Sequence, residues 1–287
     1  MRRIRLPRWA ALVWLGAAVP SLHAQLDLRL ETPKSSYLQY APIPVTVQLK
    51  NIGAQPLVLD GDRNGQPWLE VIVQSIDGLV LKPDRPLAPP RVTLSPGESR
   101  ALPLDLTPHF LVRDPGGYRV RASARLASGE TLMTEPLSFL IGRGEVIWTV
   151  PRGEGRERRI FSMLKFYEDP NVGLYLRVEV PDQNLVYPAR RLGPFLGLGQ
   201  PTAEFDAQNH LHLLYTVAAG QHRLTVVNLD GTTLREETRQ ETTEKPKLRK
   251  SPDGWVDVVG GTVILPSHLR EKLSTLQARA GTASPSP

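Results

Sequence analysis

The chain has 287 residues, which is enough for two ordinary domains. Hydrophobic residues make up 40% of it and charged residues 22%, a balance that excludes an intrinsically disordered or membrane-embedded chain. Because the sequence has no cysteine, it also excludes disulfides, thiol nucleophiles, iron–sulfur clusters and a cysteine-linked lipoprotein anchor.

The first 24 residues have the features of a secretory signal peptide. Four arginines at positions 2, 3, 5 and 8 precede an apolar run from Trp9 to Val19, and Pro20 then leads to Ala24. A basic start, a short apolar run and a small residue before the cut are typical of such signals, so we predict cleavage between Ala24 and Gln25. The alternative is a signal anchor retained in the membrane. It is disfavoured because the apolar run is only about half of the roughly 20 residues that span a bilayer.

Export removes most of the basic character of the chain. Its formal net charge is +6, but four of the 35 Lys and Arg precede residue 25, so 31 remain against 29 Asp and Glu, a net charge of +2. We therefore expect no nucleic-acid partner, since such binding needs a basic face. No later segment approaches 18 continuous apolar residues, so we expect no transmembrane segment in the mature chain. A cysteine-free exported chain favours the bacterial periplasm or the cell exterior as its location.

Residues 25–142 alternate short strand patterns with turn residues. Leu26–Leu30 and Pro44–Leu49 alternate as half-buried strands do, and Trp68–Ile76 predicts a longer strand. Further strands are expected at 79–81, 101–104, 118–122 and 132–141, each entered through a glycine-containing turn such as Asp77-Gly78. Seven to nine strands at this spacing predict a two-sheet β-sandwich. Prolines within the runs, such as Pro103, suit edge strands and bulges.

The same segment resembles the immunoglobulin-like modules of secreted bacterial proteins. The resemblance is carried by Pro33–Val45 leading to Leu49–Gly53, and by the later segments Leu94–Glu98 and Pro115–Val120. It implies an immunoglobulin-like sandwich over residues 25–142. Such modules usually carry no catalytic residues, so the resemblance implies no catalytic role for any residue of this domain.

Residues 143–160 are predicted to form a linker. Glycines at 142, 144, 153 and 155 are interleaved with arginines at 143, 152, 156, 158 and 159. Only the apolar stretch Val146–Val150 interrupts this composition. The linker separates the sandwich from a second domain, which we expect over residues 161–265.

The second domain contains an internal repeat. Pro201–Leu214 aligns without gaps with Pro246–Val259 at an offset of 45 residues, so that turn falls on turn and strand on strand. A hairpin at Asp230-Gly231 is expected between the two copies, and an earlier copy within Phe161–Val180. Repeats of this length and content resemble the blades of a β-propeller. With room for two or three blades, the resemblance implies an open stack or a ring completed by oligomerisation. A chance similarity of two hairpins is the alternative.

A short helix is predicted at residues 266–280, with Ser267 as its N-cap and Leu269, Leu273 and Leu276 on one face. Residues 281–287 are expected to be a disordered tail. The predicted fold class is therefore all-β. It comprises an immunoglobulin-like sandwich, a second antiparallel domain of blade-like hairpins, and the short C-terminal helix.

His210 and His212 are the most suggestive residues for chemistry. Residues two apart on a strand point to the same face, and two imidazoles there begin a candidate metal site. Glu204 and Asp206 share one face of the preceding strand and are the candidate carboxylate ligands. His222 is expected about 13–16 Å away along the neighbouring strand, too far to share the metal.

The alternative for this segment is purely structural, and we favour it. In that interpretation His210 and His212 face solvent. The core is then formed by the alternating residues Leu211, Leu213, Tyr215 and Val217. His222 is expected to pair across the sheet with Thr216 or Val217.

Other catalytic patterns are missing from the sequence. It has no Gly-x-Ser-x-Gly elbow and no phosphate-binding loop. Glu168-Asp169 and Glu236-Glu237 are strand neighbours that point to opposite faces, so they form no acid–base pair. Basic clusters at Arg158-Arg159, Arg190-Arg191 and Lys245–Lys250 would suit an anionic glycan or lipid surface, but a solvated face is the favoured interpretation.

The sequence thus predicts an exported, non-catalytic binding protein without a cofactor. Its expected partner is a protein or a glycan of the cell envelope, and its oligomeric state is left open. One alternative is a metal-assisted hydrolase that uses His210, His212, Glu204 and Asp206. Another is a protease inhibitor that acts through an exposed loop of the sandwich.

Overall fold

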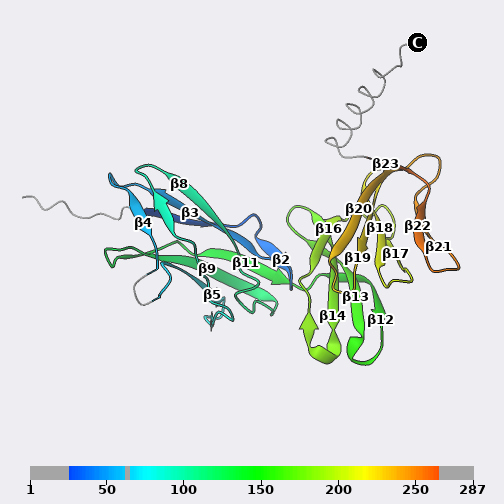
Figure 1. Ribbon diagram of the computed structural model, residues 1–287, viewed down its shortest axis with the longest axis horizontal. Coiled ribbons are helices and arrows are strands. Elements are labelled where there is room, and N and C mark those ends of the chain that lie inside the picture. The colour runs from blue at the N-terminus through cyan, green and yellow to red at the C-terminus, as the bar shows by residue number, and fades with distance from the viewer. Residues whose placement is uncertain (1–25, 62–64, 265–287) are drawn as a thin grey trace, which may run out of the picture.

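The structure is a computed structural model that describes residues 26–61 and 65–264. Two domains follow each other along the chain, coloured from blue to green and from green to orange in Figure 1. Strands and turns dominate both, and helix within the described residues is limited to the 3-10 turns Gly155–Glu157 and Pro181–Gln183, so the predicted all-β class is confirmed. No helix in these ranges is long and apolar enough to cross a membrane. The predicted signal peptide at 1–24, helix at 266–280 and tail at 281–287 lie outside the described residues.

The first domain contains two main sheets and a small one. Strands β1 (Leu26–Glu31), β3 (Pro44–Asn51) and β8 (Ser99–Asp105) form an antiparallel sheet in the order β1-β3-β8. The second sheet has the order β2-β11-β9-β5-β6 and consists of β2 (Ser36–Leu38), β5 (Leu69–Ser75), β6 (Val80–Leu81), β9 (Gly116–Arg125) and β11 (Leu137–Gly142), with β10 (Thr131–Met133) also paired to β9. The small sheet pairs β4 (Leu57–Leu59) with β7 (Val92–Leu94).

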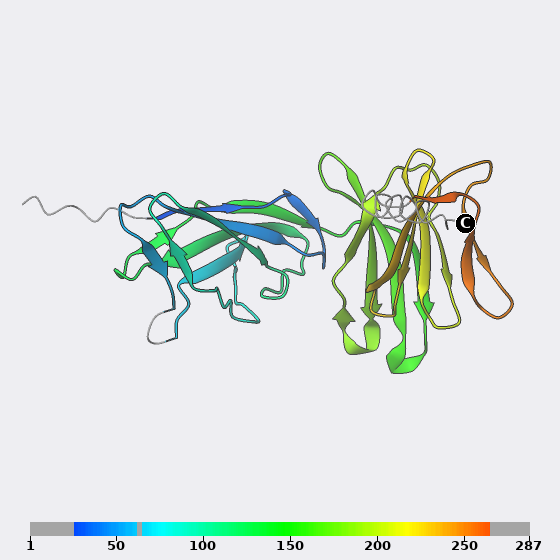
Figure 2. The ribbon, with the colours of Figure 1, turned by 45° about the horizontal axis from the view of Figure 1, so that its top comes forward.

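Alternating apolar residues explain why the two main sheets pack face to face. In β3, Val45, Val47 and Leu49 are buried, while the residues between them are more exposed. These side chains join two core clusters with apolar residues that β5 and β9 present from the other sheet. The predicted two-sheet sandwich is therefore confirmed. Its strands run along the long direction of the molecule, whereas those of the second domain run across it (Figure 2).

Two local predictions in this domain are also confirmed. β5 and β6 pair across the Asp77-Gly78 turn, where Gly78 has a φ of 95°. Pro103 lies in β8, an edge strand, where its missing N–H removes no ladder hydrogen bond.

The connection between the domains is shorter than the predicted linker at 143–160. β11 ends at Gly142, and β12 (Glu145–Arg152) already pairs with β13 (Arg159–Tyr167) in the second domain. The physical reason is the apolar stretch Val146–Val150, whose Trp148 and Val150 pack against the core of the second domain. The surrounding glycines and arginines are typical of a linker, and for this reason the strand was not predicted from the sequence.

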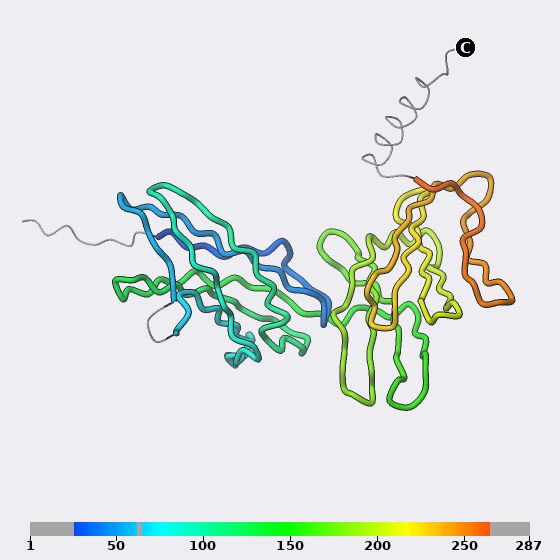
Figure 3. The backbone as a smooth tube through the Cα atoms, viewed as in Figure 1, coloured from blue at the N-terminus to red at the C-terminus, as the bar shows by residue number. Residues whose placement is uncertain are grey.

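The second domain is a series of antiparallel sheets arranged like propeller blades (Figure 3). The first blade has the order β12-β13-β14-β15, in which β14 comprises Val172–Val180 and β15 comprises Leu185–Val186. A further strand, β16 (Arg190–Pro194), also pairs with β14. The second has the order β17-β18-β19-β20-β23, formed by β17 (Thr202–Phe205), β18 (Leu211–Ala218), β19 (Gln221–Val227), β20 (Thr233–Gln240) and β23 (Thr262–Ile264). The third is the hairpin β21 (Lys247–Lys250) and β22 (Val256–Val259). The predicted blade-like hairpins are therefore confirmed.

Successive blades pack through separate apolar layers. Phe161 and Met163 of the first blade share a core with Leu211 and Leu213 of the second. On the other face of the second blade, Leu214 packs with Leu248 and Val258 of the third. β18 is consequently covered on both faces.

The predicted 45-residue repeat matches the strand register. β17 pairs with β18 from Thr202↔Leu214 to Phe205↔Leu211, and β21 pairs with β22 from Lys247↔Val259 to Lys250↔Val256. Each paired position of the third blade is thus displaced from the second by the same offset. Two similar hairpins arising by chance would not need to share this register.

The turns of the two hairpins also have equivalent geometry. Asn209 and Gly254 have positive φ angles of 64° and 84°. The N–H of His210 donates to Asp206 Oδ1 at 2.8 Å, and the N–H of Trp255 donates to Ser251 Oγ at 3.1 Å. In each copy a short polar side chain at the first turn position therefore accepts the N–H of the fifth.

Candidate functional site

The first strand of each blade has a free edge, and cavities lie between these strands. Among the described residues β12, β17 and β21 each pair on one side only. A cavity of about 480 Å³ lies between the second blade and β21, and one of about 350 Å³ between β12 and β17. Both are lined by Ala203 and Glu204, so the two cavities border the same strand, β17. We call the two cavities together the β17 groove and each of them a compartment.

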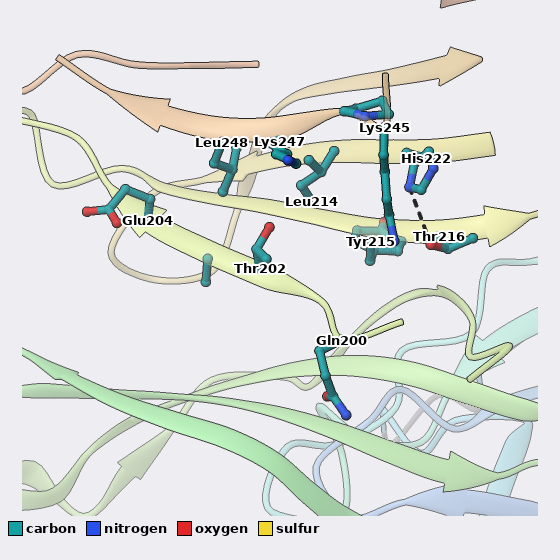
Figure 4. A pocket seen from close by; sticks show the side chains of 12 residues that line it. Gln200, Thr202, Glu204, Leu214, Tyr215, Thr216, His222, Lys245, Lys247 and Leu248 are labelled. Atoms are coloured by element: carbon teal, nitrogen blue, oxygen red, sulfur yellow. Dashed lines mark hydrogen bonds between the residues drawn. The ribbon is translucent and has the colours of Figure 1, made fainter. Parts of the chain in front are cut away.

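The compartment between the second blade and β21 has mixed polar and apolar walls (Figure 4). Thr202 and Glu204 project from β17, while Lys245, Lys247 and Leu248 line the opposite side. Neither Lys245 nor Lys247 pairs with a carboxylate of the described residues, so this polar compartment suits hydrogen-bonding or negatively charged groups.

The compartment between β12 and β17 has a larger share of apolar residue types in its lining. It is lined by Trp148, Thr149, Val150, Pro201, Ala203, Glu204, Phe205 and Leu211. The indole N–H of Trp148 is buried and has no hydrogen-bond partner among the described residues. Leaving such a donor unsatisfied costs about 1–3 kcal/mol.

The turn after β17 brings three of the four predicted metal ligands together. Asp206 Oδ2 lies 3.1 Å from Nδ1 of His210 and 3.0 Å from Nε2 of His212. Asp206 Oδ1 accepts the backbone N–H groups of Gln208 and His210 at 2.9 and 2.8 Å. Burial by itself raises the pKa of Asp206, but hydrogen bonds from His212 and His210 outweigh it, and this pKa lies below its ordinary value.

Glu204, the fourth predicted ligand, is held elsewhere. It lies opposite His212 in the strand ladder, but its Oε1 is 3.0 Å from Nζ of Lys250. The parts of the chain that the structure describes contain no group of three or more His, Cys, Asp or Glu arranged to hold a metal ion. In the arrangement seen, Asp206 and the two imidazoles stabilise the hairpin turn, and the metal site stays a prediction.

The expectation that both histidines face solvent is wrong for His212. Its side chain is 11% exposed, whereas that of His210 is 36% exposed. The third blade covers the face of β18 from which His212 projects, and the sequence pattern gave no sign of that cover. His222 pairs with Thr216, as predicted, and its Nε2 lies 3.0 Å from Oε2 of Glu241.

Sequence reasoning singled out Glu204 of the groove lining as a site residue, but it did not bring Trp148, Lys245 and Lys247 together with it. Trp148 falls in the predicted linker, and Lys245 and Lys247 belong to a basic cluster interpreted as a solvated face. The signal that would have found them is the 45-residue repeat. Since consecutive blades stack, the repeat places the start of β21 beside the start of β17.

Comparisons with known proteins identify no family for the chain. No protein-family model matches it, and no curated protein matches its sequence. A β-glucosidase from Listeria innocua is similar over 41% of this chain, at 18% identity and a TM-score of 0.28, and the chain spans only 16% of that protein. The sporulation control protein Spo0M from Bacillus subtilis is similar over 60% of this chain and 91% of its own, at 12% identity and a TM-score of 0.30. The YadV chaperone is similar over 75% of this chain and 99% of its own, at 9% identity and a TM-score of 0.24.

Proposed function

We propose that this chain is an exported, non-catalytic binding protein of the bacterial envelope or exterior, which holds a protein or glycan ligand in the β17 groove. The observation that carries the proposal is the groove itself. Within the described residues, one compartment has a polar wall with two lysines that pair with no carboxylate, and the lining of the other consists mostly of apolar residues. Concave sites with apolar walls and a few placed polar groups are typical of ligand binding.

The side chains around the groove support binding rather than catalysis. Glu204 is engaged by Lys250, and His222 by Glu241 and Thr216. A catalytic base needs a nucleophile or substrate proton within hydrogen-bond reach. The other imidazole–carboxylate contacts, around Asp206, are used within the turn.

The proposal is tested by affinity capture. Tagged residues 25–287 serve as bait for a bacterial envelope extract and a glycan panel, with a moderate-salt wash and competition by untagged protein. The Thr202→Trp variant fills the polar compartment from an exposed strand position. It is expected to abolish retention, while Thr93→Trp, an exposed strand position of the first domain, leaves it intact. Ligand retained equally by both variants would contradict the proposal.

A metal-assisted hydrolase is the second candidate. The observation in its favour is the convergence of His210 and His212 on one oxygen of Asp206. Stoichiometric zinc binding that is lost in His212→Ala, together with hydrolysis of esters, glycosides or peptides above a blank, would replace the binding proposal with this one.

A further inference from the structure

We infer that the ligand of the β17 groove is an extended peptide segment of a partner protein, which adds as a strand to the free edge of β17 and alternates apolar with acidic side chains. This inference rests on the proposed function and chooses between its two ligand classes. It is carried by the backbone of β17, by the two compartments beside it and by their charges.

The free edge of β17 presents unused backbone groups. The N–H of Asp206 donates to the carbonyl of His210 at 3.0 Å, which makes these two residues a hydrogen-bonded pair. Hydrogen-bonded pairs alternate along an antiparallel ladder, so Glu204 and Thr202 also bond to β18. The N–H and C=O groups of Ala203 and Phe205 therefore point away from the sheet. An added strand would pair with these groups.

β17 lacks the feature that blocks the edge of the first sheet. The edge strand β8 contains Pro103, which removes one donor from its outer side. No residue from Thr202 to Phe205 is a proline, so each keeps its backbone N–H. Pro201 lies just before the strand. No proline therefore removes a donor from the outer edge of β17.

The two compartments match the alternation of an added strand. Successive side chains of a strand point to opposite faces. A strand beside β17 would thus direct every second side chain toward Lys245 and Lys247, and the others toward Trp148 and Phe205. This geometry selects a segment in which acidic and apolar residues alternate.

The charges around the groove determine why the polar residues of the ligand strand should be acidic. Glu204 is compensated by Lys250 at 3.0 Å, which leaves Lys245 and Lys247 without a carboxylate partner in the described ranges. A peptide carboxylate would supply that partner.

The test uses a fluorescein-labelled peptide of three Val-Glu repeats, titrated into residues 25–287 and followed by fluorescence anisotropy. The matched control peptide has the same composition in two blocks, three valines and then three glutamates. Binding of the alternating peptide at least about fivefold tighter than the block peptide is expected, since the block form loses the match at one or more positions. Equal binding of both peptides, or binding of neither, would overturn the inference.

Variants of the protein test each element of the site. Ala203→Pro removes the outward N–H and is expected to weaken binding about fivefold, while Ala203→Val retains it. Lys245→Gln with Lys247→Gln is expected to weaken binding and flatten its salt dependence, whereas the matched Lys50→Gln with Lys82→Gln in the first domain leaves both unchanged. If Ala203→Pro fails to fold, a Val-Glu peptide N-methylated at alternate positions removes donors from the ligand side instead. Unchanged affinity in the folded proline variant, or for both N-methylated registers, would contradict strand addition.

The two proposals fail in different ways. A glycan retained through the groove, with no binding of the Val-Glu peptide, overturns the peptide inference and leaves the proposed function standing. Ligands whose retention is unaffected by Thr202→Trp overturn both.

Discussion

Nζ of Lys34 in the first domain lies 3.0 Å from Oε1 of Glu168 in the second, and this ion pair joins the two domains. Glu168 also accepts hydrogen bonds from the hydroxyl of Tyr175 and from Nε of Arg191. An apolar cluster that includes Leu38 and Tyr175 lies at the same junction. A short connection, a shared apolar cluster and a buried carboxylate together favour a fixed relative orientation of the domains.

We expect Glu168→Gln to destabilise the protein by about 1–2 kcal/mol, because it leaves Lys34 and Arg191 without their counter-charge. The cost is kept modest by the partial exposure of these cations, 29% and 41%. Chemical denaturation of both proteins gives the difference. Glu145→Gln is the matched control, since its ion pair with Lys165 is largely exposed and its loss should change little. Equal effects of the two substitutions would contradict a structural role for the junction network.

The contribution of Glu168 to the free energy of unfolding depends on pH in a defined direction. Burial raises the pKa of Glu168, but hydrogen bonds from Tyr175, Lys34 and Arg191 outweigh it and hold this pKa below its ordinary value. A carboxyl whose pKa is depressed by folding stabilises the native state above its unfolded pKa, and this stabilisation is lost as the pH falls through the native pKa. The stability difference between wild type and Glu168→Gln should therefore be full at pH 7 and shrink as the pH falls below about 4. A difference that grows toward low pH would contradict the assignment.

The contact between the second and third blades is tested at Gly254. The N–H of Ala207 donates to the carbonyl of Gly254 at 2.9 Å, and a Cβ at Gly254 would lie 2.9 Å from that of Ala207. Gly254→Ala therefore adds a collision to the strain of a positive φ. Gly129→Ala has a similar φ of +87° but open space around it, so it carries the strain alone. We expect Gly254→Ala to cost about 1 kcal/mol more than Gly129→Ala in unfolding free energy. Equal losses of unfolding free energy in the two variants would contradict a close contact between Gly254 and Ala207.

The fold was largely predictable from local pattern, and the site was not. Alternation in Pro44–Leu49 and the glycine turns identified the strands of the sandwich, because one face of each strand is buried. The register of the 45-residue repeat followed from matching turns at Asn209 and Gly254. The groove, by contrast, depends on which strand edges remain unpaired after the blades stack. The stacking of the blades also buries His212, and it packs Trp148 of the predicted linker against the core of the second domain. Neither the burial of His212 nor the packing of Trp148 can be predicted from a short window of sequence.

A zinc titration tests the predicted metal site. We expect no stoichiometric uptake by residues 25–287, since Glu204 is bound to Lys250 and Asp206 is hydrogen-bonded to two imidazoles and two backbone N–H groups. Calorimetry measures the stoichiometry, and His212→Ala is the control. One zinc bound per chain, and lost in His212→Ala, would contradict this account of the turn.

Export is tested by the mature N-terminus. Expression of the full chain in a bacterial host, followed by fractionation and intact-mass analysis, is expected to give a chain that starts at Gln25 in the periplasm or the medium. Ala24→Arg, which replaces the small residue before the cut, should leave the precursor uncleaved. A cytoplasmic chain that keeps residues 1–24 would contradict the predicted export.

The most direct test of the binding account is the retention of an envelope ligand by wild type, Thr202→Trp and Thr93→Trp, measured side by side on equal amounts of folded protein. Wild type and Thr93→Trp are expected to retain the same ligand, whereas Thr202→Trp loses it, because only the indole at position 202 fills the compartment between the second blade and β21. Equal retention by all three proteins would contradict the assignment of the β17 groove as the binding site.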